Sequence, residues 1–328
     1  MTTTRPYSRI VLPDDPPANA VGPLEPRLRL LTDELAWHRD VPATEEELVR
    51  RVKDADAIIS SRATVRFTRS VQSACPGLKI IARAGAGVDH IELAAARDLG
   101  VTVTNSPGCG TPYVAEHALT LALAVSRQIV LSDRHIREGG WTRSFINELY
   151  GKTLGVVGTG AIGQRLIQLG RGIGMEVIAW TLHPSPQRAA QYGVEFVPLE
   201  DLLRRADVVS LHVELSPLTR QLLGREQLAL LKPTAILVNT ARGGVVDEAA
   251  LLEALEQGKI AGAGLDVFET EPLPAGHPLT RLDNVVLTCH QGLLSRPAVH
   301  RAFEMALEAL EAFAAGQPIH VVAWGRRR

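Results

Sequence analysis

The chain has 328 residues, of which 45% are hydrophobic and 22% are charged, and its formal net charge is −1 at pH 7. This length is large for one hydrophobic core, so we expect two domains. A net charge near zero gives no electrostatic reason to expect binding to nucleic acid or to an anionic membrane. No uncharged apolar run reaches the roughly 18 residues of a membrane span, and the N-terminus lacks a signal-peptide pattern.

The three cysteines, Cys75, Cys109 and Cys289, are odd in number and far apart in the sequence. This usage fits a reducing cytoplasm better than a disulfide framework, so we expect a cytoplasmic protein. We expect no metal site. Residues 326–328, three arginines after a glycine, are predicted to be a solvated tail.

Short apolar runs alternate with helical patterns along the chain. Ten runs are predicted to be strands, at residues 9–13, 57–60, 78–84, 101–105, 153–158, 176–180, 207–213, 235–240, 260–268 and 284–289. Helical patterns fall between most of them, for example at 43–55, 92–100 and 247–258. Apolar strands between helices indicate parallel sheets covered on both faces, and ten strands suit two sheets better than one. The Pro-rich stretch 13–26 is predicted to be a loop.

Two longer helical patterns bear on how the domains connect. Residues 111–139 are predicted to form a single helix long enough to link two domains, with Pro112 near its start. Residues 296–316 predict another long helix that ends at Gly316 and is long enough to return the chain to the first domain.

The stretch GVVGTGAIG, residues 155–163, has the glycine spacing of a dinucleotide-binding loop. Gly158 permits a tight turn, Gly160 allows the backbone to approach phosphate, and Gly163 allows the helix to pack on the strand. The helix N-terminus that follows offers unpaired N–H groups to the pyrophosphate. An apolar strand precedes the loop and a helical pattern follows it, which is the context that this motif requires.

The next strand ends without the acid that binds the ribose hydroxyls of NAD. Thr181 stands in that position, and a neutral residue there removes the repulsion that excludes the 2′-phosphate of NADP. No arginine lies beside Thr181 in the sequence to attract that phosphate, and Arg188 is the nearest. The sequence therefore leaves NAD and NADP open as cofactors.

Charged side chains accompany three predicted strands of the second half. Arg242 follows one strand, Asp266 lies within the next with Glu271 just after it, and His290 ends the last. The carboxyl ends of parallel strands share one edge, where ligands bind in such folds. Hydride transfer to a 2-keto acid needs an acid for the carbonyl oxygen and a cation for the carboxylate. His290 can serve as the acid, with Glu271 favouring its protonated form, and Arg242 can bind a carboxylate bidentately.

Six motifs in chain order resemble the D-isomer-specific 2-hydroxyacid dehydrogenases. They are ARAGAGVDHIEL (82–93), VTNSPGCGTPYVAEHALTLALA (103–124), LGVVGTGAIG (154–163), LVNTARGGVVDEAAL (237–251), GAGLDVFETEPLP (262–274) and LTCHQG (287–292). The resemblance implies two doubly wound parallel-sheet α/β domains, with a Rossmann cofactor domain inserted into a flavodoxin-like substrate domain. The implied domains are residues 1–107 plus 294–328 for substrate binding and 108–293 for dinucleotide binding.

The resemblance also implies roles for individual residues. Arg242 matches the substrate-binding arginine, Glu271 the acid that orients the histidine, and His290 the catalytic histidine. The implied cofactor-binding residues, with Asp266 at the nicotinamide amide and Thr240 bordering the nicotinamide, are Gly158, Gly160, Ala161, Ile162, Gly163, Thr181, Thr240, Ala241 and Asp266. Besides Arg242, the implied substrate-binding residues are Ser61, Arg62, Ala84, Gly85 and Ala86.

The sequence departs from the family pattern at three positions and leaves the substrate open. Cys289 replaces the usual proline before the histidine, Gln291 follows it, and Thr181 replaces the usual acid. Hydroxypyruvate or glyoxylate on one side and 3-phosphoglycerate on the other remain candidate substrate types. The alternative function is that of a nucleotide-sensing, non-catalytic binding protein, like the transcriptional corepressors of this fold. The family also pairs through the cofactor domain, so we expect a homodimer.

Overall fold

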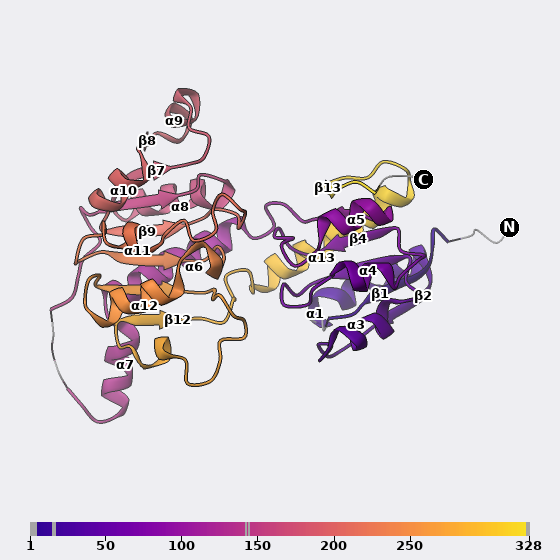
Figure 1. Cartoon of the computed structure of the whole chain (residues 1–328), viewed down its shortest axis with the longest axis horizontal. Coiled ribbons are helices and arrows are strands. Elements are labelled where there is room, and N and C mark those ends of the chain that lie inside the picture. The colour runs from indigo at the N-terminus through magenta and orange to yellow at the C-terminus, as the bar shows by residue number, and fades with distance from the viewer. Residues whose placement is uncertain (1–4, 15–17, 142, 144, 326–328) are drawn as a thin grey trace. The chain divides into compact units, whose positions relative to one another are not determined.

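The chain divides into two compact units in this computed structural model, which describes residues 5–14, 18–141, 143 and 145–325. One unit comprises Met1–Gly110 with Leu294–Arg328, and the other comprises Thr111–Leu293 (Figure 1). The corresponding boundaries expected from the sequence are 107/108 and 293/294. The predicted tail at 326–328 lies outside the described residues.

The first unit contains a six-stranded sheet in the order β13-β5-β4-β3-β1-β2. Strands β1 to β5 pair in parallel, in the order 2-1-3-4-5 that is typical of flavodoxin-like folds. The C-terminal β13 adds to β5 in the antiparallel direction. The strands are β1 (Tyr7–Leu12), β2 (Thr32–Trp37), β3 (Ala57–Ser60), β4 (Ile80–Arg83), β5 (Thr102–Thr104) and β13 (Val321–Ala323).

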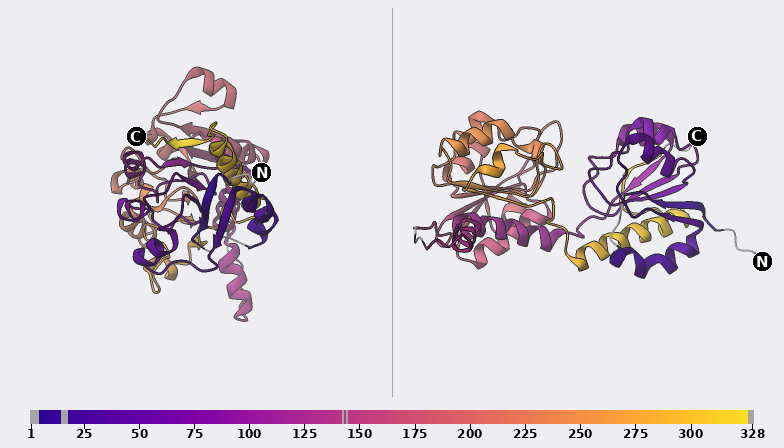
Figure 2. Two further views of the ribbon diagram at one scale, coloured as in Figure 1. Left: turned by 90° about the vertical axis from the view of Figure 1, so that its right-hand side faces the viewer. Right: turned by 90° about the horizontal axis from the view of Figure 1, so that it is seen from below.

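Helices cover both faces of this sheet (Figure 2). On one face, α3, α4 and α5 bury Leu48, Val71 and Ala96 against Ile58 and Ile81. The C-terminal α13 packs on the other face with α1, and the Tyr7 hydroxyl donates to the Leu310 carbonyl at 2.8 Å. The helices are α1 (Ala18–Val21), α2 (Glu25–Leu31), α3 (Glu45–Val52), α4 (Arg69–Ser73), α5 (Leu93–Leu99) and α13 (Arg296–Ala314), with a 3-10 turn at Gly22–Leu24.

The second unit contains a seven-stranded, fully parallel sheet in the order β12-β11-β10-β9-β6-β7-β8. This is the Rossmann order, and its direction reverses between β6 and β9. The predicted fold class, with two doubly wound parallel-sheet domains, is confirmed. The strands are β6 (Thr153–Val157), β7 (Glu176–Trp180), β8 (Glu195–Phe196), β9 (Val208–Leu211), β10 (Ile236–Asn239), β11 (Gly262–Leu265) and β12 (Val285–Leu287).

Two apolar layers hold the helices of the second unit on its sheet. Helices α6 and α8 bury Leu121 and Leu166 on one face, and α10 and α12 bury Leu202 and Leu251 on the other (Figure 2). The helices are α6 (Thr111–Ser126), α7 (Ile129–Arg137), α8 (Ala161–Gly172), α9 (Pro186–Tyr192), α10 (Leu199–Arg205), α11 (Arg225–Leu228) and α12 (Glu248–Glu256), with 3-10 turns at Gly243–Val245 and Pro278–Arg281.

The sequence missed three strands, and all three lie at sheet edges. Strand β2 begins with the polar Thr32 and has two exposed acidic residues, β8 has two residues, and β13 has three. Edge strands are covered less completely than central ones, which weakens their apolar pattern. Of the four edge strands only β12 was predicted, from the run at 284–289.

One predicted helix and one predicted loop differ from the structure. The single helix expected over 111–139 is two helices, α6 and α7, bent by 58°. Gln128 takes a left-handed φ of +51° between them, which a continuous α-helix does not allow. The loop expected over 13–26 is helical from Ala18, because prolines in the first turn of a helix lose no intrahelical hydrogen bond.

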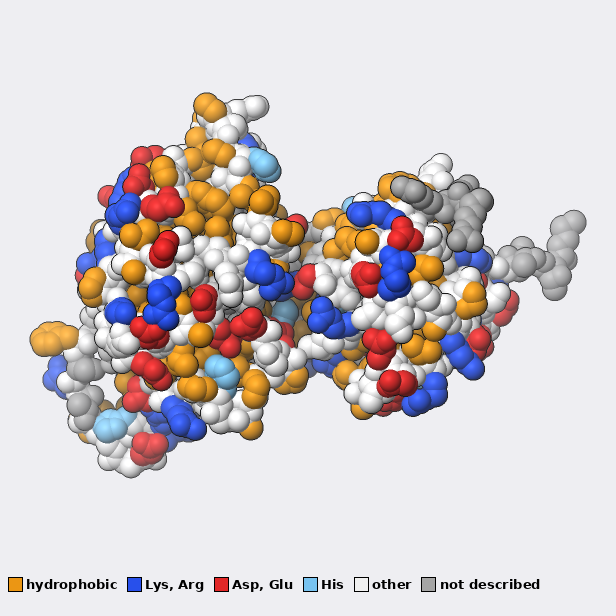
Figure 3. All heavy atoms as spheres, in the orientation of Figure 1, with side chains coloured by type: hydrophobic (Ala, Val, Ile, Leu, Met, Phe, Trp, Pro, Cys, Tyr) orange, Lys and Arg blue, Asp and Glu red, His pale blue; other side chains and the backbone are white. Residues whose placement is uncertain are grey.

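Acidic and basic side chains are interspersed over the face of each unit seen in Figure 3. Within the described ranges, no single helix has the length and hydropathy to cross a membrane, and α6 with α7 meets that criterion only as a bent pair.

Candidate active site

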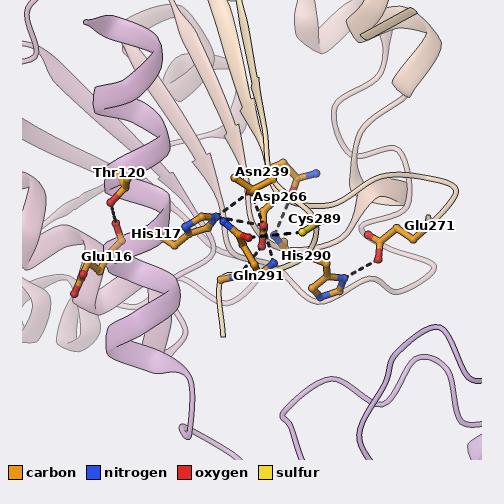
Figure 4. A network of polar contacts seen from close by, with 12 residues as sticks. Glu116, His117, Thr120, Asn239, Asp266, Glu271, Cys289, His290 and Gln291 are labelled. Carbon is orange, nitrogen blue, oxygen red and sulfur yellow. Dashed lines mark hydrogen bonds and ion pairs between the residues drawn. The ribbon is translucent and has the colours of Figure 1, made fainter. Parts of the chain in front are cut away.

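A histidine–carboxylate pair lies beyond the carboxyl ends of β11 and β12. His290 Nδ1 is 2.7 Å from Glu271 Oε2 (Figure 4). An ionised carboxylate only accepts hydrogen bonds, so Nδ1 carries the proton and donates it. The side chains of His290 and Glu271 are 34% and 20% exposed, which leaves the imidazole open to a reactant.

Glu271 is held as a carboxylate by its surroundings. Partial burial would raise its pKa, but the hydrogen bond and charge of His290, the Phe268 amide and the charge of Arg242 hold the pKa below its ordinary value. The Phe268 N–H donates to Oε1 at 3.0 Å. Glu271 therefore stays negative at neutral pH and accepts the hydrogen bond from Nδ1 of His290.

The turn that carries His290 is organised by Asp266, which comes one residue after β11 rather than within it. His290 has a left-handed φ of +52°, which is uncommon for a residue with a side chain. Its N–H donates to the Asp266 carbonyl at 2.8 Å. The next two amides, of Gln291 and Gly292, donate to the Asp266 carboxylate at 2.9 and 3.0 Å. Asp266 thus binds three consecutive amides and stabilises this conformation.

The Asp266 carboxylate has further partners (Figure 4). The Thr288 hydroxyl donates to it at 2.6 Å, and His117 Nε2, from α6, lies 3.3 Å away. Burial would raise the pKa of Asp266, but the hydrogen bonds of His117, Thr288 and the two amides outweigh burial and lower it. The observed contacts of Asp266 shape the His290 turn, and its contact with nicotinamide stays a prediction.

Arg242 follows β10 in a loop fixed by Asn239. The Asn239 side chain accepts from the Ala241 N–H at 3.0 Å and donates to the Arg242 carbonyl at 2.9 Å. Gly243 then passes so close to the chain after β11 that a Cβ would lie 1.9 Å from the carbonyl carbon of Phe268. This close approach brings the charge of Arg242 near Glu271, and the sequence reading assigned no role to Asn239.

The glycine loop after β6 has the features of an anion site. A Cβ on Gly158 would lie 2.6 Å from the His212 carbonyl oxygen, and a Cβ on Gly163 would lie 2.0 Å from the Gly158 oxygen. A Cβ on Gly160 would meet no atom within 4 Å and would instead fill the approach to the loop. Gly160 caps α8 without a side-chain hydrogen bond, so the first-turn amides, which include those of Ala161 and Ile162, can bind an anion. This geometry fits a dinucleotide pyrophosphate.

Other expected cofactor residues lie at the same edge of this sheet. Thr181 directly follows β7 and is half-buried. Thr240 and Ala241 follow β10, and the buried Thr240 hydroxyl has no hydrogen-bond partner among the described residues. No sequence pattern indicated His212, which follows β9 and whose carbonyl oxygen lies against Gly158 of the glycine loop. Burial lowers the pKa of His212 to about 4, so the ring is neutral.

In the first unit, a buried carboxylate fixes the loop that contains Ser61 and Arg62. Asp14, with none of its surface exposed, accepts from the Ser61 N–H at 2.7 Å and from the Arg62 N–H at 2.8 Å. The Ser61 hydroxyl donates to the same carboxylate at 2.8 Å. No sequence pattern indicated this role, because Asp14 is 47 residues from Ser61.

The loop of Ala84, Gly85 and Ala86 leaves the same edge of the first sheet. Its backbone is held by residues after β5, since the Ser106 N–H donates to the Gly85 oxygen at 2.9 Å and Asn105 Nδ2 donates to the Ala86 oxygen at 2.7 Å. The first unit therefore brings its five expected substrate residues to one sheet edge. Among the residues with described positions, no group of His, Cys, Asp and Glu side chains could hold a metal ion.

Comparisons with known proteins agree with this geometry. Residues 119–292 match the family model for the NAD binding domain of D-isomer specific 2-hydroxyacid dehydrogenases. A glyoxylate reductase of Korarchaeum cryptofilum is 42% identical over 86% of both chains. A D-3-phosphoglycerate dehydrogenase of Methanocaldococcus jannaschii is 43% identical over 84% of this chain, a match that spans 52% of that protein. The crystal structure of the TT0316 protein from Thermus thermophilus superposes with a TM-score of 0.87 at 40% identity, over 96% of this chain and 100% of that one.

Replacing Gly243 by alanine tests the close approach that places Arg242. The added Cβ would overlap Phe268 backbone atoms, so we expect the free energy of unfolding to fall by about 1–3 kcal/mol. Urea denaturation measures this change. Gly172→Ala is the control, because a Cβ there meets no atom and alanine favours helix. Equal stability of the two variants would contradict the packing argument.

Replacing Asp14 by alanine tests its hold on the Ser61 loop. The Ser61 and Arg62 amides would lose a buried hydrogen-bond acceptor, at a cost of about 1–3 kcal/mol each. We expect their hydrogen exchange to accelerate roughly tenfold or more. Ser61→Ala is the control, since it removes a hydroxyl and leaves both amides bound to Asp14. Unchanged exchange in Asp14→Ala would show that other contacts fix this loop.

Proposed function

Because this chain belongs to the D-isomer specific 2-hydroxyacid dehydrogenases, enzymes that interconvert 2-hydroxy and 2-keto acids with NAD(P), we propose that His290, Glu271 and Arg242 carry out this reaction. The observation that supports these roles most is the His290–Glu271 hydrogen bond of 2.7 Å near the charge of Arg242. It supplies a proton donor and a cation at neighbouring strand ends.

In the reducing direction, bound NAD(P)H supplies the hydride to the keto carbon. His290 donates the Nε2 proton to the carbonyl oxygen, which becomes the hydroxyl of the product. Glu271 accepts from Nδ1 throughout, orients the ring and stabilises its positive charge before transfer. In the oxidising direction the neutral imidazole takes the hydroxyl proton back.

Arg242 binds the substrate carboxylate in this proposal. Its planar guanidinium can donate two parallel hydrogen bonds to a carboxylate, which fixes the keto carbon relative to His290. Asn239 and Gly243 are positioning residues for this arginine, because they fix the loop on both sides of it.

We assign the dinucleotide to the glycine loop and its neighbouring strand ends. Gly158, Gly160, Ala161, Ile162 and Gly163 would hold the pyrophosphate. Thr181 would border the adenosine ribose, while Thr240, Ala241 and Asp266 would border the nicotinamide. The uncapped amides of α8 and the unpartnered Thr240 hydroxyl support this assignment.

The proposed substrate class is a small 2-keto acid, with glyoxylate and hydroxypyruvate as first candidates. The similarity to glyoxylate reductases over most of both chains supports this choice. A phosphorylated acid, 3-phosphohydroxypyruvate, is the second candidate, because Arg62 lies in the loop that contains Ser61 and the buried Arg83 ends the strand that precedes Ala84. Substrate binding by the Ser61 and Ala84 loops stays a prediction.

We also propose a homodimer formed through the second unit. Helix α7 buries none of its residues, although several of them are apolar. Ile129, Val130 and Ile136 are each more than half exposed. Trp141 is 81% exposed just beyond this helix. Such apolar surface is typical of a protein interface. The cytoplasm stays the expected location, because the chain has three free cysteines.

A substrate panel with His290→Ala tests the reaction and its acid. With NADH or NADPH, we expect the wild type to reduce at least one of glyoxylate, hydroxypyruvate and 3-phosphohydroxypyruvate, followed at 340 nm. His290→Ala should lower kcat by about 100-fold or more while cofactor binding, measured by fluorescence, persists. Normal turnover in this variant would refute the assignment. Cofactor binding without any turnover by the wild type would favour the nucleotide-sensing alternative.

Replacing Glu271 by glutamine tests the role of its charge. Glutamine keeps the size of the side chain but brings no negative charge to the ring that donates through Nδ1. We therefore expect kcat for the keto acid to fall by about 100-fold or more, while the affinity for the cofactor is retained. Glu269→Gln, which removes an exposed neighbouring charge, is the control. An unchanged kcat in Glu271→Gln would contradict this role.

Replacing Ile136 by glutamate tests the proposed dimer. A charge on α7 would have to be buried in the interface, so we expect the mass measured by light scattering to fall from dimer to monomer. Leu30→Glu, at a 73% exposed apolar site of the first unit, is the control and should leave the mass unchanged. A monomeric wild type would refute the proposal.

A further inference from the structure

Arg188, on α9, reaches back to the glycine loop, and none of the roles above uses it. Its Nη2 donates to the Thr159 hydroxyl at 3.0 Å and to the Thr159 carbonyl at 3.3 Å. Its Nη1 donates to the His183 carbonyl at 2.7 Å. The guanidinium therefore bridges the loop that follows β6 and the loop that follows β7.

The start of α9 explains how an arginine seven positions after Thr181 reaches this place. The Ser185 hydroxyl caps the helix by accepting from the Arg188 N–H at 3.2 Å, and Pro186 opens the first turn. Helical side chains lean toward the N-terminus of their helix, so Arg188 extends back over the turn after Thr181. The sequence shows Arg188 as the arginine nearest to Thr181, and the helix start shows how its side chain reaches the glycine loop.

The two bridged loops border the place of the adenosine ribose. Val157 pairs with Trp180 in the parallel register of β6 and β7, and the Gly158 N–H donates to the Trp180 carbonyl at 2.8 Å. Thr181 therefore leaves the sheet directly beside Gly158. In this fold the first loop binds the pyrophosphate, and the residue after the second strand faces the ribose 2′ position.

The charges around this place favour an anion. The sequence has no acidic residue at 149–175 or at 177–194, the segments that form both loops and their helices. Within the described part of the chain, Arg188 forms hydrogen bonds only to neutral oxygens, and its other recorded contact is with the Tyr192 ring, 5.7 Å away. A phosphate dianion is a much stronger acceptor for a guanidinium than these oxygens.

We propose that Arg188 binds the 2′-phosphate of NADP(H), so that this chain prefers NADP(H) to NAD(H). The neutral Thr181 leaves room for the phosphate without repulsion, and Arg188 supplies the positive charge that no residue adjacent to Thr181 in the sequence carries. The inference rests on dinucleotide binding at the glycine loop, and it involves none of the residues proposed for proton transfer.

Nucleotide fragments that carry no hydride test the proposal directly. Titration calorimetry with adenosine 2′,5′-bisphosphate and with 5′-AMP measures the contribution of the 2′-phosphate alone. We expect the wild type to bind the bisphosphate about tenfold tighter or more, as for a charge-assisted hydrogen bond. Arg188→Gln should remove this preference and leave the affinity for 5′-AMP within about twofold. Fluorescence titration with NADPH and NADH should give the same order.

Two further variants keep the test decisive. Arg165→Gln is the matched control, because Arg165 is an exposed arginine of α8 that contacts Gln168. It should keep the preference for the bisphosphate. Thr181→Asp retains Arg188 but places a carboxylate at the ribose, and it should weaken binding of the bisphosphate and spare 5′-AMP.

Two results would overturn the proposal. A wild type without preference for the 2′-phosphate would remove its basis. An equal loss of both ligands in Arg188→Gln, with the preference intact in Thr181→Asp, would make Arg188 a structural link between the loops. A failure of the proposed reaction is a separate result, because these fragments bind without turnover.

Discussion

Parallel pairing gives the strands of a sheet one direction. The gathering of polar side chains at one edge of the sheet depends on that constraint. Five strands of the second unit end at one edge of its sheet, namely β6, β9, β10, β11 and β12. A glycine loop, an arginine, a carboxylate and a histidine therefore gather at this edge. More than 100 residues separate the glycine loop from the histidine in the sequence. Close approach of these loops is possible only where side chains are missing. Gly158 faces the His212 carbonyl and Gly243 faces the backbone of Phe268, and neither position has room for a Cβ.

How much the sequence predicts follows from where each element lies in the sheet. Central strands such as β9 and β10 are covered on both faces, so they appear as unbroken apolar runs. Strands β2, β8 and β13 lie at edges, where burial is partial and pairing is short, and no such pattern marked them. The break between α6 and α7 depends on the backbone of Gln128, a residue type that does not usually signal a turn.

The residues of the proposed site likewise divide into those that a sequence pattern predicted and those that it missed. Arg242, Glu271 and His290 were predicted because they follow strands that end at one edge of a parallel sheet, and because the surrounding motifs resemble a known family. Asp14 and Arg188 were not, since each acts through a contact that only the fold creates. Asn239 was also missed, although it contacts residues only two and three positions along the chain. Asp14 binds amides 47 residues away, and Arg188 binds an oxygen 29 residues away. Positioning contacts of this kind depend on tertiary structure and leave no local pattern.

The way Asp266 holds the His290 turn bears on how such an enzyme can diversify. Asp266 binds the amides of residues 290–292, a feature shared by all amino acids except proline, so the conformation of the turn does not depend on the side chains at 289 and 291. Cys289 and Gln291 are both exposed. A histidine anchored through its backbone allows the neighbouring side chains to change while the conformation of the turn is kept.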